Sequence, residues 1–439
     1  MTDGDRLTYP QAVAALTGRG RFGISLGLAR IERLMAESGH PEHGLRGALV
    51  GGTNGKGSVV AMVQSVLTAA GLRTGTMPKP HLVGYRERIA VDGTPIPGAD
   101  FAAAVARALP AIDRATAEVG PPTEFEALTA AAIEELARRA VDLAIVEVGM
   151  GGRLDATNVL DLGVAAITNV ALDHQAHLGR TLVAIGREKA AIIKPGNLAV
   201  TGASGRGLRP ITDRCAVLGV PLRRAGNGQP FRARLVESDW DGIVVDARTP
   251  SRRLTGLRIG LLGAHQAGNA AVALALLDAL DERFGLTIGE DALRRGLAEV
   301  RWPGRLELLD GSALGLGRVL LDGAHNPAGA AALARALADL GLQAPTIVFG
   351  AMRGKDVRGV LTALAPLEPR FVFTRVDDPG ALPPAELAAA WASIGGEARI
   401  APDPEAALGL ADGDPVVVAG SLYLVGAVRG MIIGMDEEE

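Results

Sequence analysis

The stretch GALVGGTNGKGSVVAMVQSVLTAAG, residues 47–71, decides the fold. Its first residues, 47–52, are small and apolar and predict a buried strand, whereas the apolar residues that follow Lys56 recur at helical spacing until Gly71. The glycine-rich turn between them, 51–59, has the context of a phosphate-binding loop. Glycines there let backbone N–H groups converge on phosphate oxygens, the helix N-terminus adds its dipole, and Lys56 supplies a point charge.

The spacing of this turn differs from that of a standard Walker A motif. Gly57 separates Lys56 from Ser58, and the leading glycine lies closer to the lysine than in that motif. A glycine-rich strand-to-helix turn without a ligand is the alternative interpretation. The residues expected to face phosphates are Thr53, Asn54, Gly55, Lys56, Gly57 and Ser58.

Short apolar runs typical of fully buried parallel strands recur along the chain and alternate with Ala- and Leu-rich helical patterns. The runs lie at 142–149, 163–170, 198–203, 318–324, 346–352, 370–376 and 415–421. A helix-rich segment separates the first three from the last four, and this restart predicts a boundary near 298–303. We therefore predict two doubly wound α/β domains, 1–298 and 299–439, with ligands bound beyond the carboxyl ends of the strands.

The composition excludes several classes of protein. Of 439 residues, 48% are apolar and 3% aromatic, which favours α/β layering over an aromatic-filled all-β sandwich. A net charge of −4 without a basic stripe argues against a nucleic-acid partner. The single cysteine, Cys215, rules out an intramolecular disulfide and a Cys-rich metal site. Because no apolar run approaches ~18 residues and the N-terminus is polar, we expect a cytoplasmic monomer without membrane association.

Lysine is rare in this chain. Five lysines stand among 45 lysines and arginines: Lys56, Lys79, Lys189, Lys194 and Lys355. The two residue types do similar work on a solvated surface, but arginine cannot replace a compact, titratable amine. Each lysine is therefore a candidate for a chemical role that arginine cannot take. Lys194, which precedes Pro195 at a predicted helix end, is instead expected to be structural.

Nine further motifs follow the phosphate loop in order. They are PHLVGYRERI (80–89), TEFEALTAAA (123–132), VEVGMGGRLDATNV (146–159), LDHQAHLGRTLVAIGREKAAIIKPG (172–196), GAHQAGNA (263–270), RWPGRLE (301–307), LDGAHNPAGA (321–330), FGAMRGKD (349–356) and GSLYLVG (420–426). With this set the chain resembles the folylpolyglutamate synthase/dihydrofolate synthase family, a branch of the Mur-ligase superfamily, from about residue 23 to 429.

The resemblance implies both an architecture and a reaction. It implies a P-loop, Mur-ligase-like ATP-binding domain with a pterin or folate site in 1–298, and a smaller Rossmann-like domain that binds glutamate in 299–439. The implied reaction is the ATP-dependent addition of L-glutamate to dihydropteroate, to tetrahydrofolate and its polyglutamates, or to both. It proceeds through an acyl phosphate, with ATP, Mg²⁺ and small-molecule substrates as the only partners.

The reaction needs cations between two anionic reactants, and the motifs supply candidates. Glu147 and His174 both follow buried strands and could share a magnesium ion at the phosphate loop, although a buried glutamate is also a common ion-pair partner. The resemblance makes both of them metal ligands, together with Ser58. It adds Asn269, Arg305 and Asp322 to the ATP contacts of the phosphate loop.

Other chemical roles also come from the resemblance. Lys189 matches a lysine that the family carries as a carbamate, an anion that holds a second magnesium; a surface helix lysine is the alternative. His325 and Ser421 match contacts to the incoming glutamate, and Lys355 matches a lysine facing the same cleft. The resulting catalytic set is Lys56, Lys189, Asp322 and His325.

Several segments match the pterin side of the family's site. Among them, Phe125 offers a stacking surface; packing in the hydrophobic core is the alternative and is more usual for a phenylalanine. The candidate pteroate or folate contacts are Ile24, Ser25, Leu26, Thr123, Phe125, Glu126, Arg153 and Asp155.

The chain departs from the family at two positions. Lys79 stands where most members have a serine that ligates magnesium, and a protonated ammonium cannot ligate a metal. Either water fills that coordination position and Lys79 points away, or its ammonium contacts the γ-phosphate and partly replaces a metal charge; the scarcity of lysine favours the second. Gly380 stands where relatives commonly have arginine, which puts one anion contact in doubt.

Two other functions are alternatives. A cell-wall Mur ligase would place a nucleotide-sugar domain ahead of the phosphate loop, and only about 50 residues precede Gly51, which is few for such a domain. A non-ligase P-loop nucleotide-binding protein would need neither the carbamate lysine nor a site at DGAHNP. The sequence leaves open whether dihydropteroate, tetrahydrofolate or both are the substrates.

Overall fold

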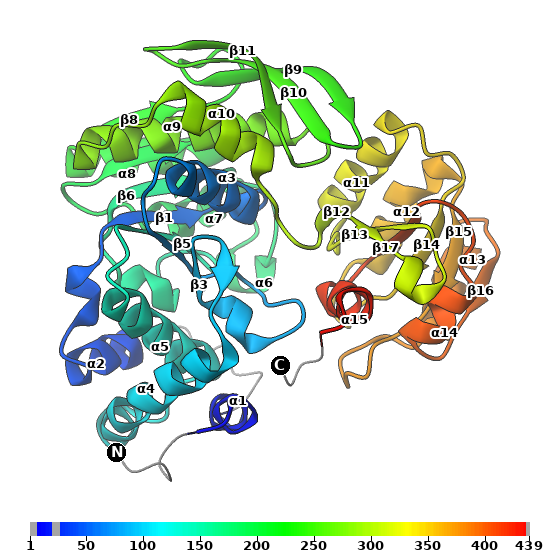
Figure 1. Ribbon diagram of the computed structural model, residues 1–439, viewed down its shortest axis with the longest axis horizontal. Coiled ribbons are helices and arrows are strands. Elements are labelled where there is room, and N and C mark those ends of the chain that lie inside the picture. The colour runs from blue at the N-terminus through cyan, green and yellow to red at the C-terminus, as the bar shows by residue number, and fades with distance from the viewer. Residues whose placement is uncertain (1–6, 20–26, 436–439) are drawn as a thin grey trace.

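The computed structural model describes residues 7–19 and 27–435, whose strands form three sheets (Figure 1). The strands are β1 (Gly47–Gly51), β2 (Thr74–Thr76), β3 (Ala90–Val91), β4 (Thr94–Pro95), β5 (Leu143–Glu147), β6 (Gly163–Ile167), β7 (Leu198–Thr201), β8 (Leu222–Arg224), β9 (Arg232–Asp239), β10 (Gly242–Arg248), β11 (Arg253–Ile259), β12 (Arg305–Asp310), β13 (Arg318–Asp322), β14 (Thr346–Phe349), β15 (Arg370–Phe373), β16 (Ala398–Ile400) and β17 (Val416–Ala419).

Helices pack on these sheets and join their strands. They are α1 (Tyr9–Thr17), α2 (Ala29–Glu37), α3 (Lys56–Ala69), α4 (Gly98–Val119), α5 (Glu124–Arg138), α6 (Gln175–Leu178), α7 (Leu182–Ala190), α8 (Gly205–Leu218), α9 (Gln266–Phe284), α10 (Glu290–Glu299), α11 (Pro327–Asp339), α12 (Val357–Leu364), α13 (Pro384–Ala392), α14 (Pro404–Gly409) and α15 (Leu422–Ile433). Short 3₁₀ turns lie at Pro41–Gly44, Tyr85–Arg88, Ala156–Val159, Ser312–Leu314 and Ala365–Leu367.

Strand β1 lies inside the eight-stranded sheet, whose order is β4-β3-β2-β5-β1-β6-β7-β8. It pairs in parallel with β5, with Val50 opposite Glu147, and with β6, with Gly51 opposite Ile167. Parallel neighbours end at the same edge of a sheet, where ligands of such folds bind. The turn after β1, the last residue of β5 and the segment after β6 therefore meet at one place.

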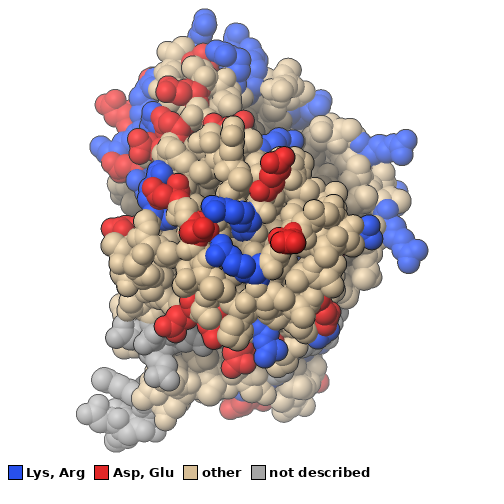
Figure 2. All heavy atoms as spheres, turned by 90° about the vertical axis from the view of Figure 1, so that its right-hand side faces the viewer, with Lys and Arg blue, Asp and Glu red and all other residues tan. Residues whose placement is uncertain are grey.

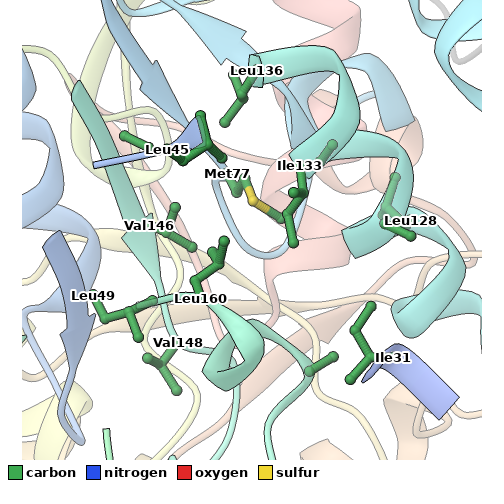
Figure 3. Close-up of a cluster of buried hydrophobic side chains, with 14 of the residues drawn as sticks. Ile31, Leu45, Leu49, Met77, Leu128, Ile133, Leu136, Val146, Val148 and Leu160 are labelled. Carbon is green, nitrogen blue, oxygen red and sulfur yellow. The ribbon is translucent and has the colours of Figure 1, made fainter. Parts of the chain in front are cut away.

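Both faces of this sheet are buried. Leu49 and Val146 belong to a core that includes Ile133 and Leu136 of α5, and Figure 3 shows these side chains gathered between β1, β5 and α5. Val50, on the opposite face, packs in a second core built largely from α3 and α9. Burial on both faces explains why these strands are continuous apolar runs rather than alternating ones.

A three-stranded antiparallel sheet, β11-β10-β9, is absent from the sequence-based prediction. It lies at the top of Figure 1 above α9. Its buried residues include Ile243, Val245 and Leu257, which join the core that contains α9, while much of β9 stays exposed. One covered face and one open face give alternating polarity, which the search for continuous apolar runs does not detect.

The C-terminal lobe is built on a six-stranded sheet of order β12-β13-β17-β14-β15-β16. Strand β12 runs antiparallel to β13, and the other pairs are parallel. The seven predicted runs are confirmed as β5, β6, β7, β13, β14, β15 and β17. The predicted α/β class is also confirmed, with mixed sheets because β3, β4 and β12 run antiparallel. Every strand of this lobe lies after residue 304, and the domain boundary at 298/299 stays a prediction.

The surface of the C-terminal lobe carries charges of both signs. Figure 2, which views the molecule from the side of this lobe, shows Lys and Arg side chains interspersed with Asp and Glu. Within the described part of the chain, no helix combines the length and the apolar character needed to cross a membrane.

Candidate active site

A cavity of about 660 Å³ lies between the two lobes. The turn between β1 and α3 lines one side, and the turn between β13 and α11 lines the other. Most of the predicted ATP, metal and catalytic residues meet here. Those that line the cavity are Thr53, Asn54, Gly55, Lys56, Gly57, Ser58, Lys79, Glu147, His174, Asn269, Arg305, Asp322 and His325.

Backbone contacts fix the shape of the phosphate loop. Asn54 N–H donates to Asn169 Oδ1 (2.9 Å), and Thr53 N–H donates to the Asn169 carbonyl (3.1 Å). Gly55, which precedes α3, has a φ of 78°, and a Cβ there would lie 2.3 Å from Asn269 Oδ1. The loop therefore needs glycine at this position for both conformation and space. Its helix N-terminus faces the cavity with N–H groups that have no intrahelical acceptor.

Lys56 is the first residue of α3, and its ammonium folds back over the loop. Nζ donates to the carbonyls of Gly52 (3.3 Å) and Thr53 (3.1 Å) and lies 4.0 Å from Glu147 Oε1. This places a fixed positive charge between the loop and the buried carboxylate. The arrangement is suited to binding a phosphate chain.

Glu147, Ser58 and His174 supply the candidate metal ligands. Glu147 is the last residue of β5, and its Oε2 is buried without a hydrogen-bond partner among the described residues. Burial raises the pKa of Glu147, while Lys56 and Lys79 oppose the shift. Ser58 Oγ accepts a bond from Gln266 Nε2 (3.4 Å), and His174 has a left-handed backbone conformation and a side chain that is 44% exposed. A buried oxygen without a donor is what a divalent cation site requires, so the residues fit Mg²⁺.

Lys189 lies beneath the phosphate loop rather than in the cavity. Its side chain, on α7, is buried, and Nζ donates to the Gly52 carbonyl (2.8 Å). Burial, with a smaller contribution from Lys56, lowers the pKa of Lys189 to about 7. The interpretation as a surface helix lysine is therefore wrong.

The C-terminal lobe contributes Asp322 and His325. The Asp322 carboxylate accepts backbone N–H bonds from Leu306 (3.0 Å) and Ala324 (2.9 Å), and burial raises its pKa while Arg305 opposes the shift. His325 Nδ1 donates to the Gly323 carbonyl (2.8 Å), so the neutral ring keeps Nε2 as an acceptor. Burial lowers the pKa of His325 to about 4, which makes that neutral state the stable one near pH 7.

Arg305 reaches the cavity from β12, where it pairs with Asp322 of β13. A Cβ on Gly323 would lie 2.5 Å from Arg305 Nη1, so glycine leaves the room that the guanidinium occupies. Burial lowers the pKa of both His174 and His325, and the charge of Lys355 makes a smaller contribution to each shift. Lys355 itself is not among the residues that line the cavity.

The comparisons with known proteins agree with this geometry. The chain matches the family "Mur ligase middle domain" over residues 50–277 and "Mur ligase, glutamate ligase domain" over residues 304–422. It is 34% identical to the dihydrofolate synthase/folylpolyglutamate synthase of Bacillus subtilis over 85% of this chain and 86% of the relative. The chain belongs to the folylpolyglutamate synthase/dihydrofolate synthase family. The resemblance inferred from the motifs is thereby confirmed, as is the assignment to the Mur ligases.

Solved structures of family members have the same fold. The Mycobacterium tuberculosis folylpolyglutamate synthase, complexed with ADP and AMPPCP, superposes with a TM-score of 0.87 at 33% identity and covers 97% of this chain and 98% of its own. An Escherichia coli protein complexed with DHPP and ADP gives 0.85 at 29% identity, over 98% and 99%. The chain also matches a probable bifunctional folylpolyglutamate synthase/dihydropteroate synthase of Haloferax volcanii, of which it spans about half the length (50%).

The residues predicted to contact the pterin bond mostly to other residues of the protein. Thr123 and Glu126 form the capping box of α5, and Glu126 also pairs with Arg30 (2.8 Å). Asp155 accepts N–H bonds from Met150 (2.9 Å) and Thr157 (3.0 Å). These bonds order the backbone around a site, and direct contact with a substrate stays a prediction.

The remaining predicted substrate contacts differ in exposure. Arg153 is exposed and pairs with Glu188 (3.0 Å). Phe125 is half-buried, and the Lys79 ammonium lies 4.3 Å from the centroid of its ring. Ile24, Ser25 and Leu26 lie outside the described residues. Ser421 is buried, caps α15 by accepting from Tyr423 N–H (3.2 Å), and is not among the residues that line the cavity.

Sequence reasoning missed several residues of the site. Gln266 is buried, contacts Ser58, and accepts from Asn269 Nδ2 (2.8 Å), three residues further along α9. Asn169, which holds the phosphate loop, follows β6. Gln266 lies in the motif at 263–270, where helical i, i+3 spacing from Asn269 was the available signal, and Asn169 lies at the end of the predicted strand 163–170. Lys194 is structural, as expected, since Nζ donates to the Asn158 carbonyl (2.7 Å).

Proposed function

We propose that this chain transfers the γ-phosphoryl group of ATP to the carboxylate of a pteroate or folate and then joins L-glutamate to it through an amide bond. The observation that supports the proposal is one cavity with two halves. The phosphate loop faces it from one lobe, and Asp322 and His325 face it from the other. A phosphate-binding protein without ligase activity would have no use for the second half.

In the first step, a substrate carboxylate oxygen attacks the γ-phosphorus and ADP leaves. The loop N–H groups and Lys56 hold the phosphate chain, and Arg305 approaches it from the C-terminal lobe. Glu147, Ser58 and His174 would hold Mg²⁺, which when bound neutralises charge on the phosphates. The buried, unpartnered Glu147 Oε2 supports that assignment.

Lys189 is a good candidate for a carbamate. A carbamate forms when a neutral amine attacks carbon dioxide, and a pKa of about 7 leaves much of this amine neutral at physiological pH. The resulting anion would lie beneath the phosphate loop, beside the Gly52 carbonyl that now accepts from Nζ. There it would complement the positive charge of Lys56.

In the second step, the amine of glutamate attacks the acyl carbon, phosphate leaves, and the nitrogen loses a proton. His325 Nε2, free to accept a hydrogen bond, suits the amine or ammonium of the incoming amino acid. The negative charge of Asp322, fixed by two backbone N–H bonds, faces the same space. Ser421 and Lys355 remain proposed contacts of the glutamate.

The test is a product assay. Purified protein is incubated with ATP, Mg²⁺, labelled L-glutamate and either dihydropteroate or a tetrahydrofolate, and products are read by mass. We expect glutamyl adducts with at least one acceptor, and none from the variant Lys56→Met, while Arg209→Ser, an exposed cation on α8, serves as the matched control. A rate of ATP hydrolysis that does not change when glutamate and acceptor are added would contradict the proposal. The two acceptors separate dihydrofolate synthase from folylpolyglutamate synthase activity.

A further inference from the structure

Lys79 is a buried cation of the site. It follows β2, lines the cavity between the lobes, and its Nζ is buried without a hydrogen-bond partner among the described residues. An ammonium offers three donors, and leaving them unmet in a buried place is costly. Such a group is expected where a ligand supplies the acceptors.

The surroundings of Lys79 show that it does not point away from the site. Nζ lies 4.3 Å from the centroid of the Phe125 ring, a cation–π distance. Its charge is attracted by Asp155 and Glu147. Of these, Asp155 already accepts bonds from Met150 and Thr157, and Glu147 Oε2 is itself unpartnered. An orphan ammonium and an orphan carboxylate oxygen therefore line one cavity without being bonded to each other.

The position of Lys79 indicates which anion it meets. Nζ lies 4.3 Å from the centroid of the Phe125 ring, and Lys79 lines both the cavity that contains the phosphate loop and a neighbouring cavity of about 400 Å³ whose lining includes residues of β2 and α15. A substrate whose flat ring stacks on Phe125, as the resemblance implies, would extend its reactive carboxylate past Nζ toward the γ-phosphate. An ammonium there meets the carboxylate and, after phosphoryl transfer, the acyl phosphate.

We propose that the Lys79 ammonium binds the carboxylate of the acceptor substrate by donating hydrogen bonds to its oxygens. This inference rests on the proposed ligase function. It differs from the favoured sequence-based expectation, in which Lys79 contacted the γ-phosphate, because the ring beside Nζ belongs to a predicted acceptor contact, Phe125. The ammonium donates hydrogen bonds to the carboxylate and forms no covalent bond.

The test compares Lys79→Met and Lys79→Arg with the wild-type protein and with Arg209→Ser as the surface-cation control. Binding of the acceptor to the protein loaded with AMPPCP is measured by calorimetry, without turnover. We expect Lys79→Met to weaken acceptor binding about 10- to 100-fold, the loss typical of a charge-assisted hydrogen bond, and to leave AMPPCP affinity within about threefold. Lys79→Arg keeps the charge and should weaken acceptor binding less than Lys79→Met does. Far-UV circular dichroism confirms that each variant is folded.

Each outcome separates this inference from the proposed function. A loss of AMPPCP affinity in Lys79→Met with unchanged acceptor affinity assigns the ammonium to the nucleotide and overturns the inference. Unchanged affinities for both ligands also overturn it. If the wild type forms no glutamyl product at all, the proposed function fails instead.

Discussion

Lys189 and Lys79 are buried amines, and burial lowers the pKa of each, to about 7 and about 8 respectively. A free lysine amine titrates above pH 10. Both groups are therefore partly neutral near physiological pH, a state that surface lysines do not reach. Because the unfolded chain binds these protons more tightly than the folded one, each lysine destabilises the fold, and the destabilisation declines as the pH rises above the folded pKa.

This argument predicts the behaviour of Lys189→Met. The substitution removes a buried amine, so we expect the midpoint of thermal unfolding to rise, with a larger rise at pH 6 than at pH 9. Turnover should fall by at least about tenfold, because the proposed carbamate cannot form. Calorimetric scans at the two pH values check the first expectation. A midpoint that falls at both pH values, or an equal rise at both, would contradict the depressed pKa.

His325 gives a second prediction at this scale. Its Nδ1 donates to the Gly323 carbonyl, so Nε2 alone is available to a ligand. We expect His325→Ala to raise the KM for glutamate about 10- to 100-fold while the KM for ATP changes by less than about threefold. Steady-state kinetics with each substrate varied in turn provide the measurement. An effect confined to ATP would remove His325 from the glutamate site.

At the scale of elements, the turn between β1 and α3 depends on Gly55. A Cβ at this position would lie 2.3 Å from Asn269 Oδ1, and the φ of 78° disfavours any other residue. We expect Gly55→Ala to weaken AMPPCP binding by at least about tenfold, because the loop must shift off α9. Gly71→Ala is the matched control, since Gly71 has a φ of 85° but nothing within 4 Å.

Calorimetry on the two variants separates strain from crowding. Both should lose about 1 kcal/mol of stability through backbone strain, and only Gly55→Ala should lose nucleotide affinity. Equal AMPPCP affinity in the two variants would show that the contact with Asn269 does not shape the loop.

Elements were predictable where one local signal sufficed. The runs that became β5, β6 and β13 have continuous apolar centres because both faces of their sheets are covered. The sheet of β9, β10 and β11 escaped prediction because only one of its faces is buried, against the core that includes α9. Its alternating pattern is weaker than a continuous run, and its charged outer positions resemble a loop.

At the scale of the whole molecule, the two lobes touch where the segment after β2 meets α15. A Cβ on Gly426 of α15 would lie 1.9 Å from the carbonyl oxygen of Leu82. Glycine at this point lets the helix approach the segment that carries Lys79. The contact thus couples the position of the C-terminal lobe to the site.

Gly426→Ala should therefore push the lobes apart. We expect turnover to fall about tenfold or more, because His325 and Arg305 move away from the phosphate loop, while AMPPCP affinity falls less. Gly409→Ala, in helix α14 with nothing within 4 Å, is the control and should be neutral or slightly stabilising. Small-angle scattering of both variants would reveal the displacement. Unchanged turnover and scattering in Gly426→Ala would show that the contact is not required.

The sequence by itself determined the α/β class, the phosphate loop at 51–59, and the two sets of strands, because these depend on local periodicity and on residue types close in the chain. The rarity of lysine singled out Lys79, and the resemblance to the family marked that position as a departure. Only the tertiary structure decided that Gln266 contacts Ser58 and that Lys79 lies over Phe125. Burial and long-range contact set the partners and the pKa of each group, and neither can be read from neighbours along the chain.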